Sequence, residues 1–256
     1  MIHETAIVSE HADISEGVSI GPYSIIGPDV SIGSETIIES HVVITGRTTI
    51  GKQNHFYPFS TIGESPQDMK YKGEDTELEI GDRNTIRESC TINKGTVQDT
   101  SVTRLGNDNW IMAYVHIAHD CQIGNNTVFA NNTTLGGHIE VGDYAIFGGF
   151  SGAHQFCKIG SHSFLGIYAG VAKDLPPYVI VTGQPAVPRG INIEGLKRRG
   201  FTTEQIRNIK NAYKLLYNSD LRLEEAQEKI SALDEVSNEL QVMLEFIQAS
   251  TRGIIR

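Results

Sequence analysis

An apolar residue recurs at every sixth position over the first quarter of the chain, without an interruption. The ten positions are Val8, Ile14, Ile20, Ile26, Ile32, Ile38, Ile44, Ile50, Phe56 and Ile62. A period of six fits neither an α-helix, which repeats about every 3.6 residues, nor a single strand, whose faces alternate. It is typical of a parallel β-helix, in which three short strands form one triangular coil and successive coils stack. Residues 18 apart therefore lie one above the other.

The repeat continues toward the C-terminus with two interruptions. The later positions are Ile80, Ile86, Ile92, Leu105, Ile111, Ile117, Ile123, Phe129, Leu135, Val141, Phe147, Ala153, Ile159, Leu165 and Val171, and those from Leu105 onward are one residue out of phase. In the first interruption the repeat positions fall on Asp68 and Glu74, and unpaired charges cannot line an apolar core. We therefore expect residues 64–78 and 93–104 to form loops that leave the wall of the β-helix.

The extent of the repeat predicts two domains. Residues 1–190 are expected to form a mainly β domain, the parallel β-helix, and residues 191–256 a C-terminal α-helical domain. In the second domain, apolar residues recur at helical spacing from Ile206 to Tyr217. Two further helices are expected over residues 222–232 and 235–249.

The formal net charge of −10 comes from the β-helix alone, because residues 191–256 carry equal numbers of acidic and basic side chains. An acidic protein disfavours nucleic acid as a partner, since phosphate binding needs a basic stripe. The N-terminal sequence MIHETAIVSEH lacks the basic and apolar regions of a signal peptide, and no apolar run is long enough to predict membrane insertion. We expect a cytoplasmic protein.

The three cysteines occupy a core position. Cys90, Cys121 and Cys157 each follow an apolar repeat residue by four positions, where small side chains recur. Burial raises the pKa of a thiol, so a nucleophilic role is disfavoured. Cys121 and Cys157 are two coils apart, roughly 10 Å at the strand spacing of a sheet, which is too far for a disulfide.

Four histidines are expected on or beside one face of three adjacent coils. His116, His119, His138 and His154 all stand within three residues of the apolar repeat positions of consecutive coils, whereas His162 belongs to another face. A single histidine in the wall of a solenoid is usually a surface residue. Four imidazoles that converge indicate a site instead.

Two neighbours of His119 add chemistry to this cluster. A carboxylate such as Asp120 can hold one imidazole nitrogen and leave the other as a base, but adjacent strand residues point to opposite faces, so the pairing needs a turn. Gly137, one coil above His119, leaves its backbone N–H accessible as a donor to an oxyanion. Without the histidines, a corner turn would explain the glycine equally well.

Several short strings then identify a family. QDMKY, IGDRN, HIAHDC, AHQFC, DLPPYV, NIEGLKRRGF and the ending STRGIIR resemble the UDP-N-acetylglucosamine O-acyltransferases that begin lipid A synthesis in Gram-negative bacteria. The resemblance spans essentially the whole chain. It implies a left-handed parallel β-helix, an exception to the right-handed crossover rule, and a homotrimer with active sites between subunits. It also implies transfer of an (R)-3-hydroxyacyl group from acyl carrier protein to the glucosamine 3-hydroxyl of UDP-N-acetylglucosamine, with neither cofactor nor metal.

The resemblance assigns roles residue by residue. It implies His119 as the general base, Asp120 as its orienting partner and Gly137 as the oxyanion donor. The implied substrate-binding residues are Asp68, Lys70, His116, His138, His154, Gln155, Asn192, Glu194, Arg198 and Arg199. Of these, Asp68 and Lys70 are implied to reach substrate from the neighbouring subunit.

Ile167 is the clearest departure within the resemblance. It matches the position that limits acyl-chain length, where glycine admits a longer chain. Forcing extra methylenes into a packed site costs about 1–3 kcal/mol. We therefore expect a preference for chains shorter than fourteen carbons, roughly ten to twelve, unless neighbouring residues reroute the groove.

Three alternatives remain open from the sequence. A related N-acyltransferase that acts on an amino sugar shares the fold, although the string NIEGLKRRGF argues against it. A metalloenzyme of the γ-carbonic anhydrase kind would use histidines such as His116 and His119 as zinc ligands. A purely structural solenoid leaves the histidine cluster unexplained. The motifs also fit an acceptor with a 3-amino group in place of the 3-hydroxyl.

Overall fold

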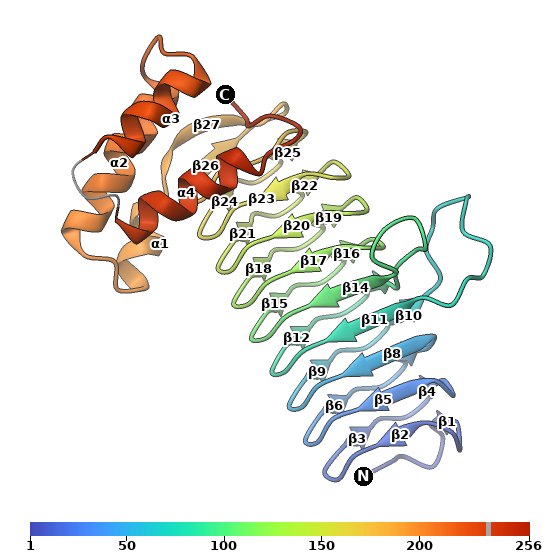
Figure 1. Cartoon of the computed structure of the whole chain (residues 1–256). Helices are drawn as coiled ribbons and strands as arrows, with labels where there is room; N and C mark the ends of the chain where they lie inside the picture. The colour runs from blue at the N-terminus through green and yellow to red at the C-terminus, as the bar shows by residue number, and fades with distance from the viewer. Residues whose placement is uncertain (234–236) are drawn as a thin grey trace.

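The computed structural model describes residues 1–233 and 237–256, which form a three-sided parallel β-helix followed by a helical part (Figure 1). The coils stack from the N-terminus upward, and the helices cover the far end of the stack (Figure 1). Among the described residues, no helix combines the length and apolar character needed to cross a membrane.

Each side of the β-helix is one sheet. The first sheet contains β1 (Ile7–Val8), β4 (Ile25–Ile26), β7 (Val43–Ile44), β10 (Thr61–Glu64), β13 (Thr91–Asn93), β16 (His116–Ile117), β19 (Thr134–Leu135), β22 (Gly152–Ala153) and β25 (Gly170–Val171). The second contains β2 (Asp13–Ile14), β5 (Val30–Ile32), β8 (Arg47–Ile50), β11 (Glu77–Ile80), β14 (Val102–Leu105), β17 (Gln122–Ile123), β20 (Glu140–Val141) and β23 (Lys158–Ile159). The third contains β3 (Ser19–Ile20), β6 (Ile37–Ile38), β9 (His55–Phe56), β12 (Thr85–Ile86), β15 (Trp110–Ile111), β18 (Val128–Phe129), β21 (Ile146–Phe147), β24 (Phe164–Leu165), β26 (Val179–Thr182) and β27 (Val187–Ile191).

The hexapeptide repeat sets the register of these sheets. Ile117 pairs in parallel with Leu135, which is 18 residues later, and both side chains are buried. The change of phase at Leu105 does not disturb the wall, because Leu105 pairs with Ile80 below it and with Ile123 above it. The extra residues are accommodated in the loop between β13 and β14. The repeat residues from Ile20 onward are buried, and Val8 and Ile14 are partly buried, as expected for the core of the β-helix.

The small residues that follow each apolar repeat residue by four positions lie at the corners of the coils, where polar ones form hydrogen bonds with the backbone. The hydroxyl of Ser24 donates to the Glu39 carbonyl at 2.7 Å and accepts from the Val42 N–H at 3.1 Å. Buried backbone groups that a tight corner leaves unpaired are satisfied in this way. Cys121 takes the same position, and its thiol donates to the Gly136 carbonyl at 3.2 Å.

The prediction that the three cysteines are buried is confirmed. Cys90, Cys121 and Cys157 are fully buried and form no disulfide. Burial is the main cause that raises the pKa of Cys90 and Cys157 to about 11 and that of Cys121 to about 12. A thiol with such a pKa is protonated at neutral pH and is a poor nucleophile.

Both loops leave the β-helix at the corner between the first and second sheets. Residues 65–76 connect β10 to β11, and residues 94–101 connect β13 to β14, inside the ranges expected from the sequence. Both project from the same side of the stack (Figure 1). The next coil turns this corner at Asp120, whose φ of 60° lies in the left-handed region that Asp tolerates better than most residues.

Among the described residues, four helices follow the last strand. They are α1 (Ile193–Arg198), α2 (Thr203–Tyr217), α3 (Leu223–Ser231) and α4 (Asn238–Gln248). The sequence predicted a helix over 235–249, and its first two residues lie outside the described residues. The three adjacent basic residues Lys197, Arg198 and Arg199 lie at the end of α1, because Gly200 follows with a φ of 80° and ends the helix.

The C-terminal residues fasten the helices to the last coil. The Asp174 N–H donates to the Gly253 carbonyl at 3.1 Å, and the Ile255 N–H donates to the Asp174 carbonyl at 2.8 Å. The buried carboxylate of Asp174 accepts from the Ser250 hydroxyl at 2.6 Å, and Ile255 packs into the core of the β-helix. The tail therefore caps the open end of the solenoid.

Candidate active site

The turn at Asp120 brings His119 and Asp120 into contact. The Nδ1 atom of His119 lies 2.9 Å from the Oδ2 atom of Asp120, although the two residues are adjacent in the chain. The left-handed conformation of Asp120 supplies the turn that this pairing needs. Because an ionised carboxylate only accepts hydrogen bonds, Nδ1 is the donor and Nε2 is left with its lone pair. The pair is thus arranged as a base with an oriented imidazole.

The Asp120 carboxylate is buried but well supplied with donors. Its side chain is fully buried, and Thr96 donates to it from the backbone N–H at 3.0 and 3.1 Å and from the hydroxyl at 2.6 Å. Burial is the largest single influence and works to raise the pKa of Asp120. The hydrogen bonds from His119 and Thr96 together outweigh burial, so the pKa lies below its usual range. Asp120 is therefore ionised at neutral pH.

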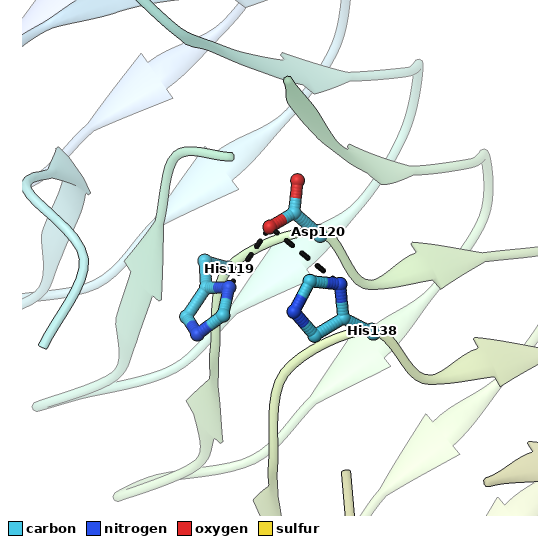
Figure 2. A group of neighbouring side chains, drawn as sticks. All are labelled: His119, Asp120 and His138. Atoms are coloured by element: carbon cyan, nitrogen blue, oxygen red, sulfur yellow. Dashed lines mark hydrogen bonds and ion pairs between the residues drawn. The ribbon is translucent and has the colours of Figure 1, made fainter. Parts of the chain in front are cut away.

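His138 stands one coil above Asp120 and completes a compact group. Its Nδ1 atom lies 3.8 Å from the Asp120 Oδ2 atom, and Figure 2 shows that oxygen between the two imidazoles. The rings of His119 and His138 meet edge to face, with centroids 4.9 Å apart. The ring of Phe156 stacks on His138 at 4.3 Å. The three polar side chains therefore have fixed mutual orientations.

Gly137 lies directly against His119. A Cβ atom at Gly137 would be 2.6 Å from the Cε1 atom of His119, closer than real Cβ atoms approach. Among the described residues, none accepts a hydrogen bond from the Gly137 N–H. The backbone donor beside the imidazole is thus available to a ligand. Any side chain at this position would displace the ring.

The other two histidines extend the site across the first sheet. The Nδ1 atom of His116 lies 2.7 Å from the Thr91 hydroxyl oxygen, and burial, followed by the nearby His119, lowers the pKa of His116. His154 and Gln155 are exposed at the upper end of the cluster. All these side chains are placed by neighbouring coils.

A groove of about 670 Å³ runs across the first sheet from this corner. His154 and Tyr168 line it, together with Asn132, Thr134, Phe150, Ser151, Gly152, Ala153, Ala169, Gly170, Val171, Ala172, Gln184 and Pro185. Outward-facing residues in register on this sheet shrink from His116 and Thr134 to Gly152 and Gly170, which hollows the surface. The exposed side chain of Ile167 precedes Tyr168 at the far corner.

The remaining predicted substrate-binding residues lie away from the histidines in the single chain. Asp68 and Lys70 belong to the loop after β10, two coils below β16, where Asp68 accepts a hydrogen bond from the Lys70 N–H at 2.9 Å. Asn192, Glu194, Arg198 and Arg199 begin or end α1, on the side of the stack opposite the loops (Figure 1). One chain alone does not bring these groups together.

Two of the residues around α1 have structural contacts of their own. The Asn192 side chain caps α1 by accepting from the Gly195 N–H at 3.2 Å and donates to the His162 carbonyl at 3.0 Å. The Arg199 guanidinium lies 4.9 Å from the ring centroid of Tyr144. Its Nη1 atom is buried without a partner among the described residues. By contrast, Arg198 is exposed, and Glu194 forms an exposed ion pair with Lys197 at 3.1 Å.

His119, Asp120 and His138 also have the residue types of a metal site. Their ligand atoms all lie within 4.8 Å of one another, and no other such group occurs among the described residues. However, the Asp120 oxygens already accept three hydrogen bonds from Thr96, and the Nδ1 atom of His119 already faces the carboxylate. The group is satisfied as a hydrogen-bonded network.

Comparisons with known proteins connect this geometry to a family. The sequence profile of the second domain of UDP-N-acetylglucosamine O-acyltransferases matches residues 174–255, and the profile of bacterial transferase hexapeptides matches residues 11–46 and 103–137. An acyl-[acyl-carrier-protein]–UDP-N-acetylglucosamine O-acyltransferase from Herminiimonas arsenicoxydans is 54% identical over 260 residues, covering 100% of this chain and 99% of the relative. The chain belongs to this family.

Solved structures agree with this family assignment. The UDP-N-acetylglucosamine acyltransferase of Francisella novicida superposes with a TM-score of 0.97 at 45% identity, covering 100% of this chain and 94% of that one. Among relatives compared by sequence, the acyl-[acyl-carrier-protein]–UDP-N-acetylglucosamine O-acyltransferase of Thiobacillus denitrificans is 57% identical over 204 residues, covering 80% of this chain and 79% of the relative. The enzyme is thus an acyltransferase, and its fold is the left-handed parallel β-helix that the resemblance implied.

Two residues of the site were not found from the sequence. Thr96 and Asp99, both in the loop after β13, contact Asp120 and His138. Residues in one column of the stack are normally 18 apart, but Thr96 precedes Asp120 by 24 positions because the loop adds chain between them. The 18-residue spacing therefore could not pair Thr96 with Asp120. The only signal in the sequence was that the predicted loop begins one coil below His119.

Proposed function

We propose that this acyltransferase moves an (R)-3-hydroxyacyl group from acyl carrier protein to the glucosamine 3-hydroxyl of UDP-N-acetylglucosamine, the first step of lipid A biosynthesis. The observation that carries the proposal is the His119–Asp120 pair, at 2.9 Å, with the N–H of Gly137 beside the imidazole. The choice of substrates is supported by the relative from Herminiimonas arsenicoxydans, which matches over its full length and is named an acyl-[acyl-carrier-protein]–UDP-N-acetylglucosamine O-acyltransferase.

The proposed reaction is a direct attack on the thioester. The Nε2 atom of His119 takes the proton of the 3-hydroxyl as its oxygen bonds to the thioester carbonyl carbon. The Gly137 N–H donates to the oxyanion of the tetrahedral intermediate. When the carbon–sulfur bond breaks, the imidazolium returns its proton to the carrier thiolate. No acyl-enzyme forms, in keeping with the raised pKa of all three cysteines.

The assembly we propose is a homotrimer with each active site between two subunits. It would let Asp68 and Lys70 of one subunit, and the α1 residues Asn192, Glu194, Arg198 and Arg199, act on substrate held beside a histidine cluster. In one chain these groups lie apart, which supports a shared site. A monomer in sedimentation equilibrium at micromolar concentration would contradict this part.

Further parts of the proposal concern the substrate groove and the compartment. His116, His138, His154 and Gln155 are proposed to contact the sugar and phosphates, and the acyl chain is proposed to follow the groove on the first sheet toward Ile167. Three buried cysteines without a disulfide fit a reducing compartment, so we propose a cytoplasmic location.

The test is an acyl-transfer assay on the purified enzyme. Donors would be 3-hydroxyacyl carrier proteins of graded chain length, and acceptors would be UDP-N-acetylglucosamine and its 3-amino analogue, with products identified by mass spectrometry. We expect O-acylation at the 3-position. Transfer only to the amine, or activity that requires added zinc after chelation, would overturn the proposed chemistry. Elemental analysis of untagged protein addresses metal content independently of activity.

A further inference from the structure

The loop of residues 94–101 is tied to the candidate active site at two points. Thr96 donates three hydrogen bonds to the Asp120 carboxylate. Three residues later, the Asp99 Oδ2 atom lies 2.8 Å from the Nδ1 atom of His138. The loop itself is closed by hydrogen bonds from the Asp99 N–H and the Ser101 N–H to the Thr96 carbonyl, at 3.4 and 3.2 Å. The loop therefore acts as a bridge between Asp120 and His138.

His138 needs a partner that Asp120 does not supply. Asp120 is 3.8 Å from the His138 Nδ1 atom, beyond hydrogen-bond distance, and its oxygens are taken by Thr96 and His119. The His138 side chain is only 8% exposed, so little water reaches it. Asp99, whose side chain is 41% exposed, is the carboxylate that closes the gap.

We propose that Asp99 is a positioning residue, which fixes the tautomer and the ring orientation of His138 for the reaction at His119. A carboxylate accepts the hydrogen of Nδ1, so in the neutral imidazole the Nε2 atom of His138 keeps its lone pair. Figure 2 shows the Asp120 contact at Nδ1, and the second nitrogen has no contact with the residues drawn. The site then holds two aspartate–histidine pairs side by side, in which His119 is the base and His138 presents a hydrogen-bond acceptor.

The packing of His138 explains why orientation matters. Phe156 stacks on one face of the ring, with an interplanar angle of 7°, and allows little tilt. A ring flip would still be compatible with that stacking, since the two faces of an imidazole are alike in shape. The Asp99 hydrogen bond is the contact that distinguishes the two nitrogens. Loss of Asp99 should therefore mix tautomers and flipped rings without unfolding the coil.

The first test reads the tautomer directly and rests on neither catalysis nor the proposed function. In the intact enzyme labelled with ¹⁵N-histidine, the His138 signals, assigned by comparison with His138→Gln, should show a protonated Nδ1 and an unprotonated Nε2 at the alkaline end of a pH titration, where the ring is neutral. In Asp99→Ala the two nitrogen shifts should move toward a mixture. Identical His138 shifts in the enzyme and in Asp99→Ala would overturn the proposal.

The second test, which does rest on the proposed function, is a double-mutant cycle in the acyl-transfer assay. Asp99→Asn should lower kcat/KM by about 10- to 100-fold, the loss typical of carboxylates that orient metal-bound histidines. Added to His138→Ala, the same substitution should cause no further loss, because its effect passes through that ring. If the double variant loses kcat/KM by the product of the two single losses, Asp99 does not act through His138. Full activity in Asp99→Asn would contradict the proposal as well.

Controls separate positioning from charge and folding. Asp75→Asn removes a carboxylate from the other loop at the same corner, where it forms an ion pair with Arg47 at 3.0 Å, and should leave kcat/KM unchanged. All variants should keep the thermal midpoint of the parent within a few degrees. If His119→Ala stays active while the tautomer result holds, the proposed base is wrong and the role of Asp99 stands.

Discussion

Gly137 and His119 are 18 residues apart in the chain, and the missing side chain of the first makes room for the ring of the second. A Cβ atom on Gly137 would lie 2.6 Å from Cε1 and 2.8 Å from Nε2 of His119. The φ of Gly137 is outside the left-handed region, so its backbone conformation does not require glycine. The requirement comes from the imidazole.

Replacing Gly137 by alanine should therefore impair catalysis through sterics alone. The N–H remains, but the ring of His119 must move away from Asp120, and we expect a loss in kcat of about 100-fold or more. Gly149→Ala is the matched control, because a Cβ there meets its nearest atom at an ordinary 3.5 Å. Steady-state kinetics of both variants decide the matter, and equal activity would show that the ring tolerates displacement.

Removal of the base is the second prediction. His119→Ala should fold normally and lose about 10²- to 10⁴-fold in turnover, as expected for a missing general base. Cys90→Ala, Cys121→Ala and Cys157→Ala should each retain activity apart from packing effects. A folded cysteine variant without activity, or an active His119→Ala enzyme, is incompatible with direct attack.

Thr96→Val should test the support of Asp120. The substitution keeps the shape but removes the 2.6 Å bond from the hydroxyl, one of the hydrogen bonds that hold the pKa of Asp120 down. Without this hydroxyl donor the pKa of Asp120 rises, so protonation of the carboxylate begins at a higher pH. The acidic limb of the kcat/KM profile should shift upward in Thr96→Val and stay in place in Thr96→Ser. An unmoved limb in the valine variant would contradict this role.

The site's histidines were predictable because the 18-residue period converts sequence into columns. His119, Gly137 and Gln155 form one column, and Asp120, His138 and Phe156 form the next. Where a loop intervenes, the period no longer gives neighbours, so the hydrogen bonds of Thr96 and Asp99 could not be inferred.

The structural contacts of Arg199 and Asn192 could not be predicted from the sequence either. The resemblance implied a substrate-binding role for Arg199, but its contact with the Tyr144 ring depends on where the last coils meet α1. The cap that Asn192 gives α1 also requires the helix boundary, which the sequence did not show. Such contacts between separate elements have no periodic signature.

Chain-length preference provides the fourth prediction. Ile167 is 63% exposed in the single chain, next to the corner where the groove on the first sheet reaches Tyr168. If the acyl chain ends against it in the assembled enzyme, Ile167→Gly should shift the optimum toward longer donors by a factor of roughly 5 to 150 in relative rate, from about 1–3 kcal/mol of overpacking. Ten-, twelve- and fourteen-carbon donors should be compared on both proteins. An unchanged profile in the glycine variant removes Ile167 as the limit.

The last prediction concerns stability in acid and involves His162, which lies outside the histidine cluster. Its ring is stacked between Tyr144 and Tyr178, with centroids 4.9 and 5.7 Å away, and Phe201 meets it edge-on. Burial, followed by the nearby charge of Arg199, lowers the pKa of His162 from 6.5 to about 4. Between these two values the unfolded chain binds a proton at this residue that the folded protein does not.

Stability should therefore fall as the pH drops from 6.5 toward about 4, and this contribution should be fully restored above 6.5. His162→Phe keeps the aromatic stack, and it removes a ring whose Nδ1 atom is buried without a partner among the described residues. We expect the variant to lose less thermal stability than the parent between pH 7 and pH 4.5, measured as the change in thermal midpoint. His41→Phe is the control, since the exposed His41 ring lies between the tilted rings of Tyr23 and Phe59, and the pH dependence of this variant should follow the parent. Parallel pH profiles for His162→Phe and the parent would show that this histidine does not govern acid stability.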